Sequence, residues 1–143
     1  MRKAFTLTEL LLTIAIIIII STFTVAFYGR FLTQNAVQDT VDRLVGNTRK
    51  AQLYAMSSKW GSNWGVNISG HTMTFYRGTS FGTKVTGFDE VFTINSNVTV
   101  SGIGDLNFAR VTGLPSATST VTISDLNNNS KTVTVNSQGV ASQ

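Results

Sequence analysis

An uncharged apolar run at residues 10–29 constrains this 143-residue chain more than any other feature of its sequence. Because an α-helix rises ~1.5 Å per residue, about twenty residues match the ~30 Å hydrocarbon thickness of a bilayer. Arg2 and Lys3 precede the run and Arg30 follows it, and the cations on the short N-terminal side favour a cytoplasmic N-terminus. The run therefore predicts a membrane-spanning helix. A secretory signal peptide cleaved after Ala26 is the alternative, since small residues precede that point.

The rest of the chain differs in composition from this run. Residues 61–143 alternate Ser, Thr, Asn and Gly with scattered apolar side chains, which indicates a polar, extracytoplasmic module with one core. The net charge is +4, but Arg2 and Lys3 supply two of those charges, so the charge is weak evidence for nucleic-acid binding. The sequence contains no cysteine, which excludes a disulfide framework, a thiol nucleophile and a cysteine metal site.

Glu9 is the one acidic residue next to the apolar run. A carboxylate in an apolar helix costs roughly 2.5–3.5 kcal/mol towards the bilayer centre, so it marks a function or sits at the headgroup level. Residues 3–11, Lys-Ala-Phe-Thr-Leu-Thr-Glu-Leu-Leu, resemble the processing motif of type IV prepilins and pseudopilins. That motif is a short basic leader and a small residue, then Phe-Thr-Leu-x-Glu-Leu and an apolar helix. The resemblance favours a retained helix over cleavage after Ala26.

The resemblance implies how the chain is processed and assembled. A prepilin peptidase that is also a methyltransferase would cleave between Ala4 and Phe5 and would methylate Phe5 as the new N-terminus. Ala4 stands where glycine is the family norm. Glu9 would pair with the terminal amine of a neighbouring subunit, because an unpaired carboxylate or ammonium is costly in a water-poor filament core.

The same resemblance implies partners and a location. The partners are the prepilin peptidase, other pilin subunits in a homo- or hetero-filament, an inner-membrane assembly platform, and membrane lipid before assembly. The expected location is the cytoplasmic membrane as a single-pass precursor with a cytoplasmic N-terminus, and then an extracytoplasmic or cell-surface filament. Loss of residues 1–4 leaves nine cationic against seven acidic side chains, so the mature chain is nearly neutral.

Beyond the run, the sequence continues as an amphipathic helix. Apolar or small residues recur at spacings of four and three on one side of a helix, opposite Asp39 and Asp42. Because no proline occurs before Pro115, one helix is predicted from residue 5 to about residue 58. The positions expected on its buried side are Val37, Val41, Leu44, Thr48, Ala51 and Ala55.

After residues 60–65 the apolar period changes to two, which is typical of β-strands. A hairpin is predicted at residues 64–68 and 72–76, around a Ser-Gly turn. One-sided alternation predicts a sheet that is wet on one face and covered by the helix on the other. The further predicted strands are residues 90–94, 98–101, 106–110, 118–124 and 131–136.

The predicted fold class is therefore α+β. A long N-terminal α-helix, transmembrane in its first half and amphipathic in its second half, packs on a C-terminal antiparallel β-sheet module, as in pilins. The expected parts are a leader, a transmembrane or filament-core helix, an amphipathic helix half and a β-rich globular module, at residues 1–4, 5–29, 30–59 and 60–143. The junction at Trp60 and Trp64, followed by many short strands, resembles the FimT- or GspH-type minor pilins.

Signals for catalysis or metal binding are weak. His71 is the sole histidine and lies at a predicted turn, so the chain is expected to be no enzyme and to need no cofactor. Asp125, Asn127 and Asn129 have the oxygen-ligand spacing of a calcium loop. Ser130 stands where such loops need glycine, which favours an ordinary Asn-rich turn over a calcium site.

The sequence favours a structural role, as a major or minor subunit of a type IV pilus or of a type II secretion-like filament. Two alternatives stay open. One is a DNA-binding uptake pilin, although no cation follows Gly139 at the C-terminal end, which counts against DNA. The other is a secreted β-rich adhesin whose signal peptide is cleaved after Ala26. The N-terminal residue of the mature protein separates these classes, because a pilin would begin at Phe5 and a secreted adhesin at Phe27.

Overall fold

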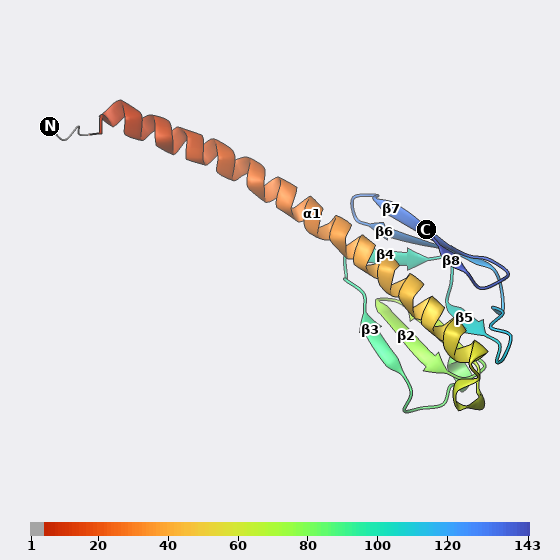
Figure 1. Ribbon diagram of the computed structural model, residues 1–143. Helices are drawn as coiled ribbons and strands as arrows, with labels where there is room; N and C mark the ends of the chain where they lie inside the picture. The colour runs from red at the N-terminus through yellow and green to blue at the C-terminus, as the bar shows by residue number, and fades with distance from the viewer. Residues whose placement is uncertain (1–4) are drawn as a thin grey trace. The chain divides into compact units, whose positions relative to one another are not determined.

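The computed structural model describes residues 5–143, without the side chains of residues 23–27 and 30. Its first element is helix α1 (Leu7–Met56, 50 residues; Figure 1), compared with the predicted helix at residues 5–58. Contacts between residues divide the chain into two compact units, Met1–Leu32 and Thr33–Gln143. Ala4, at the predicted cleavage point, lies outside the described residues.

The N-terminal unit begins with a capped helix. Thr6 precedes α1, and its Oγ1 accepts a hydrogen bond from the backbone N–H of Glu9 at 3.3 Å. Thr13, Ser21 and Thr22 each donate their hydroxyl to a carbonyl three or four residues earlier, at 2.7–2.8 Å. These hydroxyls are therefore hydrogen-bonded within the helix itself, so they can lie in an apolar environment without losing their partners.

The prediction of a membrane-spanning helix at residues 5–29 is not supported. Among the residues whose side chains are described, no helix is both long enough and apolar enough to cross a membrane. The single-pass precursor inferred from that helix therefore lacks support as well.

The unit Thr33–Gln143 contains two antiparallel four-stranded sheets, where the sequence predicted one. The first sheet has the strand order β3-β2-β1-β5, and the second has the order β4-β6-β7-β8. Two 3-10 helices, η1 (Lys59–Gly61) and η2 (Phe81–Thr83), lie in the connections. The strands are β1 (Trp64–Ser69), β2 (Thr72–Arg77), β3 (Glu90–Thr93), β4 (Val98–Ser101), β5 (Asp105–Phe108), β6 (Ser119–Asp125), β7 (Ser130–Val135) and β8 (Ala141–Ser142).

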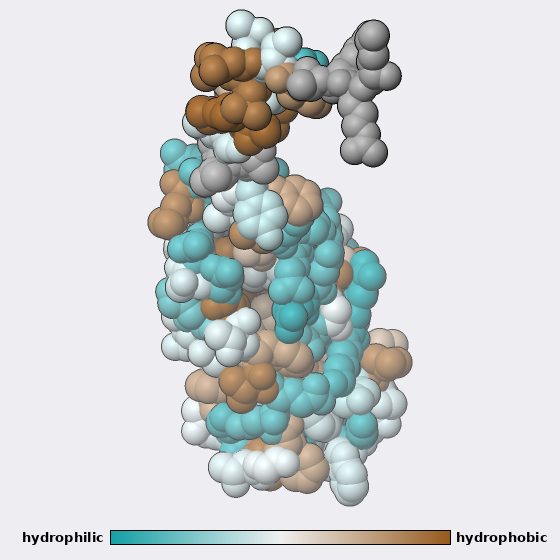
Figure 2. All heavy atoms as spheres, turned by 90° about the vertical axis from the view of Figure 1, so that its left-hand side faces the viewer, coloured by the Kyte–Doolittle hydropathy of each residue, from teal (hydrophilic) through white to brown (hydrophobic). Residues whose placement is uncertain are grey.

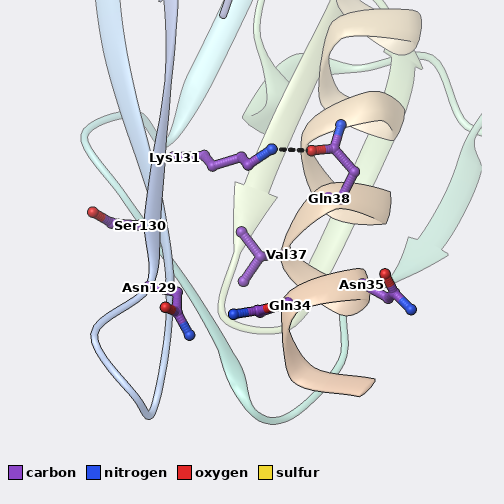
Figure 3. A pocket seen from close by; sticks show the side chains of 7 residues that line it. All are labelled: Gln34, Asn35, Val37, Gln38, Asn129, Ser130 and Lys131. Carbon is purple, nitrogen blue, oxygen red and sulfur yellow. Dashed lines mark hydrogen bonds between the residues drawn. The ribbon is translucent and has the colours of Figure 1, made fainter. Parts of the chain in front are cut away.

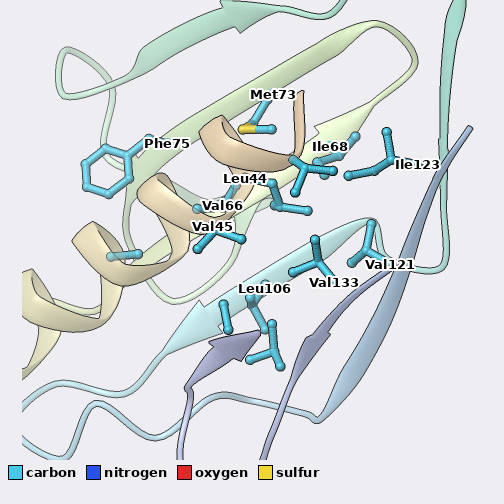
Figure 4. Close-up of a cluster of buried hydrophobic side chains, with 14 of the residues drawn as sticks. Leu44, Val45, Val66, Ile68, Met73, Phe75, Leu106, Val121, Ile123 and Val133 are labelled. Carbon is cyan, nitrogen blue, oxygen red and sulfur yellow. The ribbon is translucent and has the colours of Figure 1, made fainter. Parts of the chain in front are cut away.

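The core of this unit lies between α1 and both sheets (Figure 4). The six helix positions predicted on the buried side are all buried, at 0–3% exposure. Leu44 and Val45 of α1 belong to the same cluster as Val66 of the first sheet and Val133 of the second. Each such side chain contributes ~1.5–3 kcal/mol when it is fully buried, so the helix and the two sheets stabilise one another.

The centre of the outer face of the first sheet is buried, whereas the sequence predicted a wet face. The outward residues of the edge strand β3 are exposed. Tyr76 is opposite Gly65 in the β1–β2 pair, and its hydroxyl donates to Asp105 Oδ1 at 2.6 Å. Burial, and then the hydrogen bond to Asp105, raises the pKa of Tyr76, so the hydroxyl stays protonated and remains a donor. Asn107 Nδ2 donates to the same hydroxyl at 3.2 Å. The hydrogen-bonded side chains of Tyr76, Asp105 and Asn107 form a polar row on this face. Phe81 of η2 packs edge-on against the Tyr76 ring, with 5.7 Å between ring centroids, and helps to cover the row.

The outer face of the second sheet carries only hydroxyl side chains. The strand registers place alternate residues on one side, and every outward position within the strand bounds is Ser or Thr. These side chains are exposed or half-buried, and they bind water without carrying charge. They are Thr99, Ser101, Thr120, Thr122, Ser124, Ser130, Thr132, Thr134 and Ser142.

Candidate functional site

The described apolar side chains of the N-terminal unit are exposed around the whole helix. Phe5 is 73% exposed, Leu7 is 75% exposed, and the four isoleucines at residues 16–19 are 47–62% exposed. Four consecutive residues cover one full helical turn, so no side of this segment is polar. Figure 2 shows these side chains as a contiguous brown patch, whereas teal and white side chains dominate the displayed face of the other unit. The N-terminal apolar surface comprises Phe5, Leu7, Leu10, Leu11, Leu12, Ile14, Ile16, Ile17, Ile18 and Ile19.

This surface needs covering from outside the unit. Transfer of one such side chain from water to an apolar environment contributes ~1.5–3 kcal/mol when its burial is complete. A helix that is apolar on all sides is typical of one surrounded on all sides. The hydroxyls of Thr13 and Ser21, which lie among the apolar residues, are bonded to helix carbonyls and do not oppose such burial.

Glu9 is the only charged residue within residues 5–29. Its side chain is exposed in the first turn of α1, where a negative charge is favourable next to the positive end of the helix dipole. Among the described residues, no cation forms an ion pair with its carboxylate. Glu9 also occupies the third helical position after Thr6, so the pair has the sequence of a capping box. The spacing Thr-x-x-Glu signals this local role, which the prediction of an assembly residue had missed.

The residues of the predicted calcium loop meet in the turn between β6 and β7, where Asp125 is the acceptor. Asp125 Oδ1 accepts from the backbone N–H groups of Asn127 at 2.8 Å and of Asn129 at 2.9 Å, and Oδ2 accepts from Asn129 Nδ2 at 2.8 Å. The side-chain hydrogen bond from Asn129 is the main cause that lowers the pKa of Asp125. Both carboxylate oxygens therefore serve an Asx-type turn.

Metal ligands do not gather elsewhere in the described part of the chain. Within it, no group of three or more His, Cys, Asp or Glu side chains is placed to hold a metal ion. The calcium role of the loop at Asp125, Asn127 and Asn129 stays a prediction. His71 is exposed in the turn between β1 and β2, as the sequence predicted.

A groove of about 400 Å³ lies between the first part of α1 in this unit and the start of β7 (Figure 3). The Lys131 amine donates to Gln38 Oε1 across it. The remaining lining consists of amides, one hydroxyl and one valine, which form hydrogen bonds but supply no acid–base pair for catalysis. The lining residues are Gln34, Asn35, Val37, Gln38, Asn129, Ser130 and Lys131.

Comparison with known proteins connects this architecture to the pseudopilins. No family model matches the chain, and no curated protein matches it. Among solved structures, the chain is similar to the minor pseudopilin EpsH from the Type 2 Secretion System of Vibrio cholerae, with a TM-score of 0.53. The match has 15% sequence identity and covers 77% of this chain and 94% of that chain. The likeness concerns the fold, and the chain has the α+β fold of a minor pseudopilin.

Proposed function

We propose that the chain is a structural subunit of a pilin- or pseudopilin-type filament and that it assembles through its N-terminal apolar surface. The observation that carries this proposal is the complete ring of exposed apolar side chains between Phe5 and Ile19. Equivalent helices of other subunits are the natural cover, because they are apolar on all sides and can surround one another in a bundle. The pseudopilin fold of the rest of the chain supports the same role.

Processing would expose the residues that set the register of assembly. We propose that a prepilin peptidase cleaves between Ala4 and Phe5 and that Phe5 is then methylated. The Phe5 ammonium of one subunit would lie next to the Glu9 carboxylate of its neighbour. Because Glu9 has no cation partner among the described residues of its own chain, a neighbouring amine would supply the missing charge. An assembly platform would deliver the subunit to an extracytoplasmic filament of the type IV pilus or type II secretion class.

Glu9→Gln tests this role most sharply. Glutamine keeps the size of the side chain and serves in a capping box as glutamate does, so the helix start is preserved while the charge is lost. We expect normal accumulation of the subunit and at least about a tenfold loss from sheared filaments, because one partner of a buried ion pair is removed. Immunoblotting of whole cells and of the sheared fraction measures both quantities in a host with a prepilin peptidase and an assembly machinery.

Thr6→Ala is the matched control, since it removes the capping hydroxyl and leaves the Glu9 charge in place. This variant is expected to enter filaments as well as the unaltered chain does. Equal incorporation of Glu9→Gln would rule out the pairing role. Mass spectrometry of the N-terminal peptide provides the second readout: N-methylated Phe5 supports the proposed processing, and a mature chain beginning at Phe27 would establish the secreted alternative instead.

A further inference from the structure

One face of the second sheet carries hydroxyl side chains and no charge. Within the strand bounds of β4, β6, β7 and β8 the charged residues are Asp125 and Lys131, and both stand at inward positions, opposite Val98 and Ile123. All the outward positions are Ser or Thr. These outward side chains, the hydroxyl face, are Thr99, Ser101, Thr120, Thr122, Ser124, Ser130, Thr132, Thr134 and Ser142.

The strand registers arrange these hydroxyls as a lattice. Two pairs of threonines form its centre on β6 and β7, with Thr120 opposite Thr134 and Thr122 opposite Thr132. The outer strands extend the rows, since Ser142 of β8 lies opposite Thr134. Neighbouring strands lie ~4.8 Å apart, and alternate residues of an antiparallel strand lie ~6.8 Å apart. The hydroxyl face therefore repeats in two directions.

This lattice has a rigid backing. Threonine is branched at Cβ, so few χ1 values are open to it and its hydroxyl has few positions. The residues that alternate with the central threonines belong to the core and are 0–1% exposed. They are Val121, Ile123, Val133 and Val135. Because such a core is close-packed, the strands hold the hydroxyls at a constant spacing.

The composition of the hydroxyl face argues against most classes of ligand. A nucleic acid or an anionic lipid surface is bound by clustered lysine and arginine side chains, and a metal ion is bound by carboxylates. The centre of a stable protein interface is rich in aromatic and apolar residues. Within the strand bounds, the outward positions of this sheet supply none of these groups. The ligand that fits is uncharged, donates and accepts hydrogen bonds, and repeats with the lattice.

The surface of ice has these properties. Each hydroxyl of the face can donate one hydrogen bond and accept two, and water can do the same. Both spacings of the lattice are within about 10% of the oxygen repeats on a prism face of hexagonal ice. Neighbouring strands twist by about 20–25°, so the match is closest at the central threonines. A liquid water molecule loses entropy when a protein fixes it, whereas the water molecules of ice are already fixed.

We propose that the hydroxyl face binds ice, with its central threonines hydrogen-bonded to water molecules of the outermost ice layer. The absence of charge from the outward positions suits this role, because an ammonium group holds its own hydration water, which does not match the ice lattice. The hydroxyl face lies entirely within Thr33–Gln143. Ice binding is therefore a further activity that does not depend on filament assembly.

Slow partial freezing of the full chain in detergent tests the proposal, because growing ice rejects solutes that do not bind to it. Tryptophan absorbance of the melted ice and of the remaining liquid gives the partition ratio of the chain, with the detergent buffer as the blank. We expect the chain to be retained in the ice. Thr132→Lys should lower the partition ratio at least about fivefold, because a hydrated ammonium group would then stand within the lattice.

Thr93→Lys is the matched control, since Thr93 is also an exposed strand threonine but belongs to β3 of the first sheet. Its partition ratio should equal that of the unaltered chain. Circular dichroism checks the fold of each variant, and Thr134→Lys replaces Thr132→Lys if the latter is unfolded. The proposal is overturned if the unaltered chain stays in the liquid, or if the face variant and Thr93→Lys partition equally. Binding to crystalline cellulose without retention in ice would also overturn it, and would assign the face to a polysaccharide.

Discussion

At the scale of single residues, Gly65 shows how one missing side chain allows a buried polar row. An ideal Cβ at this position would lie 2.5 Å from Tyr76 Cζ and 2.8 Å from the Leu106 carbonyl oxygen, which are both impossible contacts. Gly65→Ala is therefore expected to destabilise the fold by about 1–3 kcal/mol, because it pushes the Tyr76 ring away from its bond to Asp105. Denaturant unfolding followed by circular dichroism measures this change.

Gly46→Ala provides the opposite expectation in the same assay. Gly46 is an exposed helical position, and a Cβ there meets no atom within 4 Å. Alanine should stabilise α1 by roughly 0.5–1 kcal/mol, since glycine is the poorer helix former. The prediction for Gly65→Ala would be contradicted if this variant were as stable as the unaltered chain. The Tyr76 ring would then move away from the new Cβ at no cost in the free energy of unfolding.

At the scale of elements, the turn between β6 and β7 depends on ionised Asp125. Its folded-state pKa is lowered, first by the Asn129 side chain, so the carboxylate stabilises the turn above its unfolded pKa of about 3.9. That stabilisation is lost as pH falls through the lower folded-state value. We expect thermal unfolding temperatures to fall below about pH 4, and Asp125→Asn to flatten this part of the profile. Asp39→Asn is the control, because the Asp39 carboxylate is 60% exposed. Identical profiles of unfolding temperature against pH for the two variants would contradict the role of Asp125.

The elements also show what the sequence pattern can reveal. The spacing of four and three identified six buried positions of α1 from Val37 to Ala55, because helix geometry alone relates those residues. It missed Thr40, Val45 and Asn47, which flank that row and are also buried. A period of two located seven strands to within two residues of their ends. It did not reveal that the strands form two sheets, because alternation defines which residues share a face and says nothing of which strands pair. The two residues of β8 are too few to show any period.

The candidate sites also differ in how far the sequence alone predicts them. Phe5 and Glu9 stand in one contiguous motif, so their proposed roles rest on the sequence alone and stay predictions. By contrast, a pocket at the C-terminal end of α1 is lined by Tyr54 of α1, Trp60 of η1 and Phe88 of a loop, and no sequence spacing links these positions. The outer face of the first sheet was predicted to be wet because its residues are Gly, Asn and Thr. The centre of that face is nevertheless buried, and Phe81 packs there against the ring of Tyr76.

At the scale of the whole molecule, the two units differ in the exposure of their apolar side chains. The N-terminal unit exposes its apolar side chains, whereas the core residues of the other unit all lie between Val37 and Ala141. The second sheet of that unit faces outward with hydroxyls, which keeps its surface hydrated without charge. Self-association should therefore depend on the first unit, and folding on the second.

Removal of residues 1–32 tests this division of roles. The remaining chain, Thr33–Gln143, keeps the complete hydrophobic core, so we expect a cooperative unfolding transition and a monomer in detergent-free buffer. The full chain should form large particles under the same conditions, because its apolar helix then has only other copies to cover it. Light scattering and analytical ultracentrifugation measure the particle size. A truncated chain that still associates would move the assembly surface into the β-rich unit, and one that unfolds without cooperativity would make the N-terminal unit necessary for folding.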